Sequence, residues 1–391
     1  MKQLILLLLL IFLGLVESDK FIVLVAGSNS FANYRHQADI CHAYQLFHEN
    51  GYPDSNIIVM MYDDIAHDES NPFPGTILNK IGGYNVYVDV PKDYVGDDVT
   101  SKNFMAILHG DNSTGKRVLN TGPKDDIFVY FSDHGGAGLI AFPNDELYAY
   151  QLIETFEYMY FGNQFRNIVF YLEACESGSM FNGLLDPRLN ILGVTASNPM
   201  EPSYACYMDA EIGTYLGDDF SVNWMENADN FEILMNETIA DEIIKIQAET
   251  NTSHVCVYGN YYLTNTNMSY YLRYNSTLRK MNSPKNKFMG TKKFMNSRDV
   301  KMEFLMKQYL KSNSIKREKI LDELSHELYQ HKVLKSMYGA PKTINGVSCY
   351  PEEYIDTRCL QNKVEEFKKV HGPLTDTSLK YIRNIGAECF S

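Results

Sequence analysis

Apolar and polar positions follow two different patterns in the first half of the chain. Five short runs rich in β-branched and aromatic residues, at 21–27, 57–62, 127–131, 167–172 and 191–195, each lead into small or polar residues. Between them, residues 35–50, 101–108 and 145–160 place apolar side chains three and four positions apart, as amphipathic helices do. Strands separated by helices of this length predict an α/β fold, with a mostly parallel sheet flanked by helices.

A change of pattern near residue 281 indicates a second region. Residues 281–298 are basic and weakly patterned, which is typical of a linker. Helical periodicity returns at 300–338 and again from 351 to the end. We therefore expect a large α/β domain over 19–280, a linker over 281–298 and an all-α domain over 299–391.

The beginning of the chain has the layout of a targeting segment. Lys2 precedes an apolar run over 4–16, which polar residues follow at 17–19. That run is too short to span a bilayer, so we predict a signal peptide over 1–18, with an uncleaved anchor as the alternative. No later run approaches membrane-spanning length, so the mature protein is expected to be soluble in a secretory, lysosomal or vacuolar compartment. Five Asn-x-Ser/Thr sequons fit that route: Asn112, Asn236, Asn251, Asn267 and Asn275.

The net charge of -14 conceals two regions of opposite sign. Residues 1–280 carry 15 Lys/Arg and 36 Asp/Glu, whereas residues 281–391 carry 20 and 13. The two regions should therefore attract each other. So acidic a main domain also argues against nucleic acid as a partner.

Two reactive side chains follow neighbouring predicted strands. His134 comes after the run at 127–131, and Cys175 after the run at 167–172. The carboxyl ends of parallel strands share one sheet edge, so an imidazole there can activate a thiol. The alternatives are a packed core thiol and a simple His-Gly turn. There is no Cys-x-x-Cys or His-x-x-x-His pair and no Gly-rich nucleotide loop, so neither a metal nor another cofactor is expected.

Several sequence blocks carry a family resemblance. Ser-Asp-His-Gly at 132–135, followed about forty residues later by Glu-Ala-Cys at 173–175, resembles the caspase-like cysteine peptidases. The closer resemblance is to the legumain family of asparaginyl endopeptidases. It rests on GSN at 27–29, NYRHQAD at 33–39, MMYDDI at 60–65, VPKDY at 90–94, DHG at 133–135, EACESGSM at 173–180, YACY at 204–207, TYLGD at 214–218 and SVNWME at 221–226.

The resemblance assigns roles by position. It implies that Cys175 is the nucleophile, that His134 is the general base oriented by Asn33, and that the amides of Gly135 and Cys175 form the oxyanion hole. The implied specificity pocket accepts asparagine, and aspartate at lower pH. Its residues are Arg35, His36, Glu173, Ser203 and Asp218. One departure is Pro202, where close relatives have a second serine.

The resemblance also implies that the C-terminal domain is a prodomain, an intramolecular inhibitor released by acid. Asn296 matches the self-cleavage site, with Asn282 and Asn286 as alternatives. The charge asymmetry suggests a latch that weakens when interface carboxylates are protonated, at about pH 4 to 5. Cystatin-like inhibitors are possible partners, besides protein and peptide substrates.

The resemblance further implies a disulfide between Cys359 and Cys389. Cys349 is then an extra thiol that could compete for Cys389, and Cys206 and Cys256 are expected to be free.

These observations predict an asparaginyl cysteine endopeptidase made as a zymogen. A peptide ligase or transpeptidase of the same fold is the enzymatic alternative. An inactive binding homologue is the alternative from another class, although the set of Asn33, His134 and Cys175 is intact.

Overall fold

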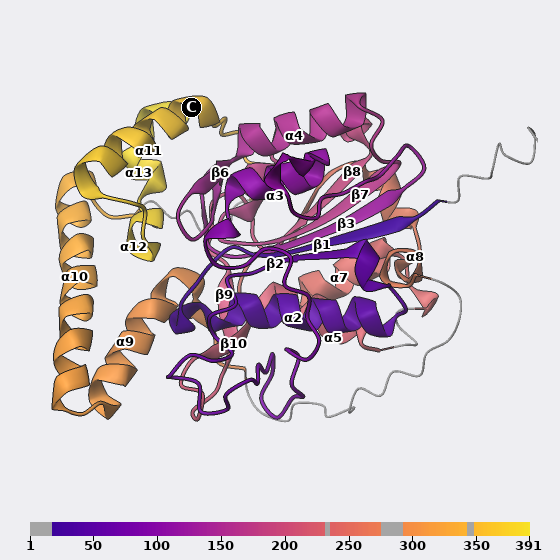
Figure 1. Ribbon diagram of the computed structural model, residues 1–391. Helices are drawn as coiled ribbons and strands as arrows, with labels where there is room; N and C mark the ends of the chain where they lie inside the picture. The colour runs from indigo at the N-terminus through magenta and orange to yellow at the C-terminus, as the bar shows by residue number, and fades with distance from the viewer. Residues whose placement is uncertain (1–17, 231–234, 275–291, 342–347) are drawn as a thin grey trace, which may run out of the picture.

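A six-stranded sheet forms the centre of the molecule in the computed structural model, which describes residues 18–230, 235–274, 292–341 and 348–391 (Figure 1). The strand order is β11-β8-β7-β3-β1-β2, and every neighbouring pair is parallel except β11 with β8. The strands are β1 (Lys20–Ala26), β2 (Ile57–Met60), β3 (Asp126–Ser132), β7 (Asn167–Glu173), β8 (Ile191–Thr195) and β11 (Cys256–Gly259). The predicted α/β fold and its five strands are confirmed, whereas β11 was not predicted.

Helices cover both faces of this sheet (Figure 1). One face carries α2 (Tyr34–Glu49), α5 (Asp219–Ala228) and α7 (Ile239–Glu249), and the other carries α3 (Ser101–His109) and α4 (Ala149–Phe161). A short helix, α8 (Met268–Leu272), contributes to the first core. Because side chains alternate along a strand, Ile22 and Leu24 of β1 enter one core while Val23 and Val25 enter the other. Burial on both faces explains the nearly continuous apolar runs.

Two small sheets extend the domain at the carboxyl ends of the strands. One joins β9 (Tyr204–Met208) to β10 (Tyr215–Asp218) and to β12 (Met295–Asn296) of the linker. The other contains β4 (Gly135–Gly136), β5 (Leu139–Ala141) and β6 (Glu146–Tyr148). The helix expected from residue 145 therefore starts later, at Ala149, because residues 146–148 pair with β5.

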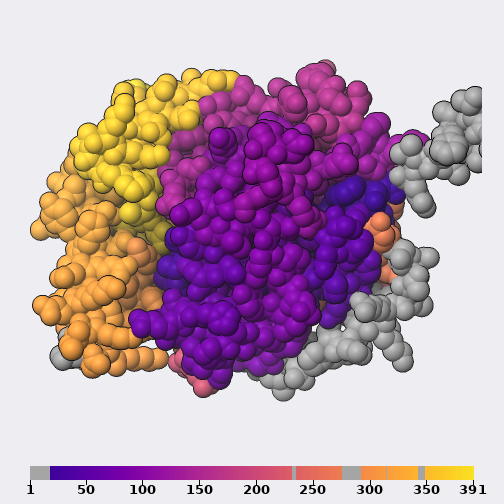
Figure 2. Space-filling model, viewed as in Figure 1, coloured from indigo at the N-terminus to yellow at the C-terminus, as the bar shows by residue number. Residues whose placement is uncertain are grey.

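The C-terminal domain packs against this end of the sheet (Figures 1 and 2). Its helices are α9 (Val300–Lys311), α10 (Ser314–Tyr338), α11 (Thr357–His371), α12 (Asp376–Leu379) and α13 (Ile382–Ile385). Leu360, Leu379 and Ile382 share an apolar cluster with Leu139 and Tyr148 of the α/β domain. Ion pairs of the expected polarity cross the interface, including Lys368 with Glu146 at 2.9 Å.

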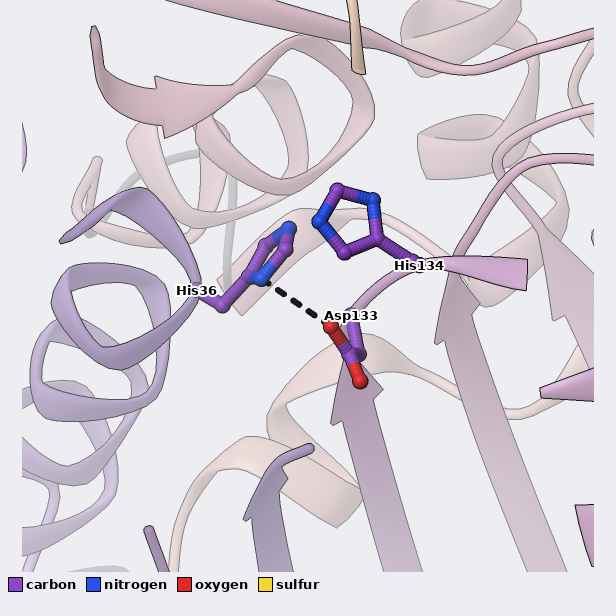
Figure 3. A group of neighbouring side chains, drawn as sticks. All are labelled: His36, Asp133 and His134. Carbon is purple, nitrogen blue, oxygen red and sulfur yellow. Dashed lines mark ion pairs between the residues drawn. The ribbon is translucent and has the colours of Figure 1, made fainter. Parts of the chain in front are cut away.

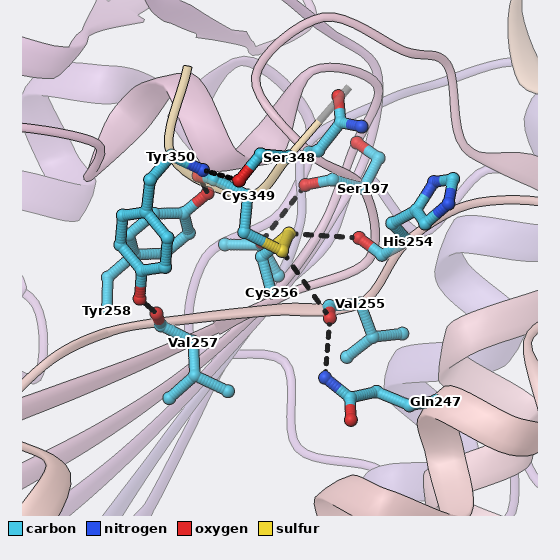
Figure 4. Close-up of a disulfide and its surroundings, with 12 residues drawn as sticks. Ser197, Gln247, His254, Val255, Cys256, Val257, Tyr258, Ser348, Cys349 and Tyr350 are labelled. Atoms are coloured by element: carbon cyan, nitrogen blue, oxygen red, sulfur yellow. Dashed lines mark hydrogen bonds between the residues drawn. A yellow bond between two sulfur atoms is a disulfide. The ribbon is translucent and has the colours of Figure 1, made fainter. Parts of the chain in front are cut away.

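Two disulfides are present among the described residues. Cys359 and Cys389 are joined within the C-terminal domain. Cys256 is joined to Cys349, with 5.5 Å between their Cα atoms (Figure 4). The prediction of a free Cys256 and an extra thiol at Cys349 is therefore wrong, because antiparallel β11 places Cys256 beside the segment at 348–350.

The Cys256–Cys349 disulfide connects the two domains covalently, because its halves stand on opposite sides of the linker. A cut anywhere in the linker leaves the domains attached until this disulfide is reduced. Three cysteines remain free in the described structure, Cys41, Cys175 and Cys206, and all are buried.

The exposure of the sequons bears on the secretory route predicted above. Asn112, Asn236 and Asn251 are exposed, whereas partly buried Asn267 caps α8 through its side-chain oxygen. Asn275, the predicted signal peptide up to residue 17, and the alternative sites Asn282 and Asn286 lie outside the described residues. Within the described ranges, no helix combines the length and apolar character needed to cross a membrane.

Candidate active site

The register between β3 and β7 brings the two candidate reactive residues to one edge. Ser132, at the end of β3, pairs with Glu173, at the end of β7. His134 and Cys175 each follow two residues later, so they leave neighbouring strands at the same level. Both are buried, at 3% and 0% exposure. The rule that parallel strands present their carboxyl ends together thus holds for this pair.

The imidazole of His134 is held from one side and free on the other. Its Nε2 lies 2.9 Å from the side-chain oxygen of Asn33, just before α2. Its Nδ1 is buried without a hydrogen-bond partner in the described structure. An Nε2–H that donates to Asn33 leaves Nδ1 as the basic nitrogen, available to accept a proton.

The thiol of Cys175 contacts Ser203, the residue just before β9. Its sulfur accepts a hydrogen bond from the amide of Ser203 at 3.3 Å. Burial raises the pKa of the Cys175 thiol, and the nearby Arg298 guanidinium opposes that rise. Burial also lowers the pKa of His134 to about 4, against the opposing charge of Asp376. In this structure both the thiol of Cys175 and the imidazole of His134 are therefore neutral near pH 7.

His36 and Asp133 lie beside the imidazole of His134 and form a cluster with it (Figure 3). His36 Nδ1 lies 3.2 Å from a carboxylate oxygen of Asp133, and the two imidazole rings meet edge to face at 4.9 Å. Each of the three residues has one atom that could bind a metal ion, and these three atoms lie within 4.8 Å of one another. However, His36 Nδ1 already bonds the Ser28 hydroxyl at 2.7 Å, and His134 Nε2 bonds Asn33. The cluster is better described as support for the imidazole of His134.

Beside the thiol lies a fully buried charged pocket. Arg35 donates from Nε to Asp218 at 2.9 Å, and His36 Nε2 lies 3.6 Å from the other Asp218 oxygen. Glu173 accepts from the amide and hydroxyl of Ser221, at 3.1 and 2.9 Å. One oxygen of Glu173 and one of Asp218 have no hydrogen-bond partner in the described structure. The pocket thus combines a buried cation, Arg35, with two buried carboxyl groups, Glu173 and Asp218.

A third carboxyl, Asp39, lies behind this pocket and was not identified from the sequence. It accepts from Asn79 at 2.7 Å and, when protonated, donates a hydrogen bond to Asp218. Burial raises the pKa of Asp39 and of Glu173 well above their ordinary values. The signal was present, since Arg35 and Asp39 are four residues apart and share one face of α2.

The linker itself occupies the site. β12 pairs antiparallel with β9, with Asn296 opposite Tyr204, and the Ser297 amide donates to the Ser203 carbonyl at 3.0 Å. Arg35 donates to the hydroxyl of Ser297 at 2.6 Å. The side chain of Asn296 instead accepts from the amide of Arg298. The expected self-cleavage residue is therefore next to the pocket rather than in it.

Comparisons with known proteins identify the family to which the chain belongs. Residues 20–274 match the model of the Peptidase C13 family. The chain is 41% identical to the legumain of Homo sapiens over 365 residues, which cover 86% of this chain and 83% of that protein. It is 37% identical to the vacuolar-processing enzyme of Citrus sinensis over 402 residues, 95% of this chain and 81% of that one.

Among solved structures, caspase-1 from Spodoptera frugiperda aligns with a TM-score of 0.38 and 9% identity, over 62% of this chain and 86% of that one. That likeness is too slight to add to the argument.

The buried Arg35–Asp218 pair predicts a pH-dependent cost when it is broken. Arg35→Met should lower the free energy of unfolding by about 3 kcal/mol near pH 7.5, because it leaves a buried carboxylate unpaired. Without Arg35, the pKa of Asp218 lies further above its unfolded value of 3.8, so the deficit should shrink near pH 5 as Asp218 takes up a proton. Urea unfolding at both pH values measures the difference.

The matched control for this prediction is Arg188→Met, which removes an exposed ion pair with Asp186. It should leave the free energy nearly unchanged at either pH, because exposed ion pairs contribute little to stability. A loss for Arg35→Met as small as that of the control would contradict the assigned role.

Proposed function

We propose that this chain, which belongs to the peptidase C13 family and is a cysteine-type endopeptidase, cleaves peptide bonds on the carboxyl side of asparagine. The observation that carries the proposal is the pocket beside Cys175, which contains one buried cation and the buried carboxyl groups of Glu173 and Asp218. A carboxamide is the side chain that uses both, since its oxygen accepts and its nitrogen donates. Arg35 would bind the oxygen, and Glu173 and Asp218 would accept from the nitrogen.

The chemistry assigned to the reacting groups is thioester formation and hydrolysis. The sulfur of Cys175 attacks the backbone carbonyl carbon of the asparagine, and its proton passes to Nδ1 of His134. The carbonyl oxygen becomes negative and is stabilised by the amides of Gly135 and Cys175. The C–N bond then breaks as the leaving amine takes the proton from His134. Water attacks the thioester by the reverse proton path and regenerates the thiol.

Aspartate fits the same pocket only if a proton is added. An aspartate carboxylate would meet two acidic groups, unless the substrate, Glu173 or Asp218 is protonated. Burial, followed by the charge of Asp218, raises the pKa of Glu173, so its neutral form persists to higher pH than that of an ordinary glutamate. Falling pH increases the protonated population of every group involved.

We further propose that the C-terminal domain keeps the enzyme inactive until acid opens it. The linker fills the pocket, and α12 places Asp376 3.5 Å from Nε2 of His134. The charge asymmetry suggested that protonation of interface carboxylates would open the enzyme, but Glu146 does not fit this mechanism. Burial raises the pKa of this interface residue, so its protonation favours the closed form rather than the open one.

His134 is the better candidate for the acid trigger. Its pKa is about 4 in the closed form, lowered from 6.5 first by burial and then by Arg35, Arg298 and Lys301. Opening removes Arg298, Lys301 and part of the burial, and it also removes the opposing Asp376. A group whose pKa is depressed in the closed form stabilises that form above its ordinary pKa, and this stabilisation is lost as the pH falls toward 4. The closed form should therefore weaken between about pH 6.5 and 4.

The compartment and partners follow from the same proposal. A relative named vacuolar-processing enzyme supports a lysosomal or vacuolar site, where acid would be available. The substrates are proteins and peptides. Cystatin-like inhibitors and self-cleavage after Asn296 remain predictions from family resemblance.

Peptides that differ only in the residue before the scissile bond test the proposed specificity. The acid-treated chain should cleave after asparagine but not after glutamine. Cleavage after aspartate relative to asparagine should rise by up to about tenfold per pH unit between pH 7 and 4, following protonation. Mass spectrometry of the products measures these ratios.

In the same assay, Cys175→Ala provides the inactive control. Equal cleavage after glutamine and asparagine, or an unchanging aspartate ratio, would refute the pocket assignment. A joined peptide in place of a hydrolysed one would favour the ligase alternative.

Hydrogen exchange tests the acid trigger in the full chain carrying Cys175→Ala, which prevents self-cleavage. After correction for intrinsic exchange rates, protection of residues 292–298 should fall between pH 6.5 and 4. Adding His134→Asn should reduce that fall, because it removes the titrating imidazole. His254→Asn, at an exposed histidine of the α/β domain, is the matched control and should leave the fall unchanged. An undiminished acid response with His134→Asn would rule out this trigger.

A further inference from the structure

The linker shows how a peptide lies across the active site. Met295 and Asn296 form an added strand beside β9, and the amide of Ser297 continues the pairing onto Ser203. The same Ser203 donates its own amide to the sulfur of Cys175. Ser297 therefore stands where a substrate would place its asparagine, with Arg35 donating to its hydroxyl. The residue after Ser297 marks the first position beyond the scissile bond.

Arg298 occupies that position and is buried at 5% exposure. Its guanidinium donates to the carbonyl of Gly135, at 3.1 Å from Nε and 2.5 Å from Nη2. Nη2 also donates to Glu176 at 2.7 Å. Both acceptors belong to the loops that carry the catalytic residues, since Gly135 follows His134 and Glu176 follows Cys175. The site for this guanidinium is thus part of the catalytic edge.

Glu176 is held in an unusual conformation for this contact. Its φ of 53° lies in the left-handed region, which a residue other than glycine adopts at a cost of about 1 kcal/mol or more. Its side chain is buried, with an exposure of 3%. The cations that contact it in the described structure are Arg298 and Arg383, at 2.7 and 3.3 Å. Both belong to the linker or the C-terminal domain, so opening leaves the carboxylate without a counter-charge.

From these contacts we infer that Glu176 and the Gly135 carbonyl form a subsite for a guanidinium directly after the scissile bond. The inference rests on the proposed endopeptidase function and adds a second specificity: among peptides with asparagine in the pocket, those with arginine next are preferred. A substrate arginine would replace the contacts of Arg298, and it would restore the pairing of a carboxylate that is costly to leave unpaired in a poorly hydrated site.

The subsite also accounts for the register of the linker. With Arg298 bound to Glu176, Ser297 rather than Asn296 meets Arg35. Serine offers no carboxamide to the pocket, so the bond after it is a poor substrate. Cleavage after Asn296 requires the linker to move by one residue, which Arg298 opposes while it is bound.

The test compares peptides of the form Asn-Arg, Asn-Ala and Asn-Glu across the scissile bond, using the acid-treated full chain. We expect kcat/KM for Asn-Arg to exceed that for Asn-Ala by about tenfold, as one charge-assisted hydrogen bond would give, with Asn-Glu the poorest. In Glu176→Gln the Asn-Arg to Asn-Ala ratio should fall toward one. Glu176→Asn is a second variant, since asparagine tolerates a positive φ.

The matched control is Glu154→Gln, at an exposed glutamate of α4 that also pairs with an arginine, and it should retain the wild-type ratio. Equal cleavage of Asn-Arg and Asn-Ala by the wild-type chain, or an arginine preference that survives both Glu176 substitutions, would overturn the subsite. Failure to cleave even Asn-Ala would instead refute the proposed function, so the two outcomes are distinguishable.

Discussion

The buried charge of Arg35 is the constraint on which the rest of the site depends. A guanidinium with no exposed surface requires acceptors on several sides, and it finds them in Asp218 and in the linker residue Ser297. Because Asp39 and Glu173 lie close to Asp218, one cation faces three buried carboxyl groups, and burial together with the charge of Asp218 raises the pKa of Asp39 and of Glu173. The charge of the pocket therefore depends on pH. The proposed preference for asparagine, and for aspartate at lower pH, follows from this charge, whereas the proposed acid opening is assigned to His134.

The linker and the C-terminal domain cover this site. The linker adds a strand to β9 beside the pocket, α12 places Asp376 near the imidazole of His134, and two arginines pair with Glu176. The Cys256–Cys349 disulfide adds a covalent connection that outlasts a cut in the linker. In the activation that we propose, opening, cleavage and separation of the domains are three distinct steps. On that proposal they depend on protonation, on the register of the linker and on reduction, respectively.

The central strands and the pairing of His134 with Cys175 could be predicted from the sequence, because they depend on local patterns. Buried strands are recognisable as apolar runs, and their order in a parallel sheet brings His134 and Cys175 to one edge. Pairings between distant segments could not be predicted. The four residues of β11 are too short a run to predict an antiparallel strand, so the disulfide between Cys256 and Cys349, 93 residues away, was not predicted. Arg298 looked like one more basic linker residue, and only its burial against Glu176 shows its role.

A covalent probe tests the central claim most directly: that Cys175 is a nucleophile beside an asparagine pocket that the chain itself covers. An asparaginyl chloromethyl ketone, followed by intact-mass and peptide-mass analysis, should add one label to Cys175 at pH 5 and far less at pH 7.5 before opening. The buried thiols of Cys41 and Cys206 should remain unlabelled. Absence of the adduct at acid pH, a label on another cysteine, or equal labelling by the glutaminyl analogue would contradict the account.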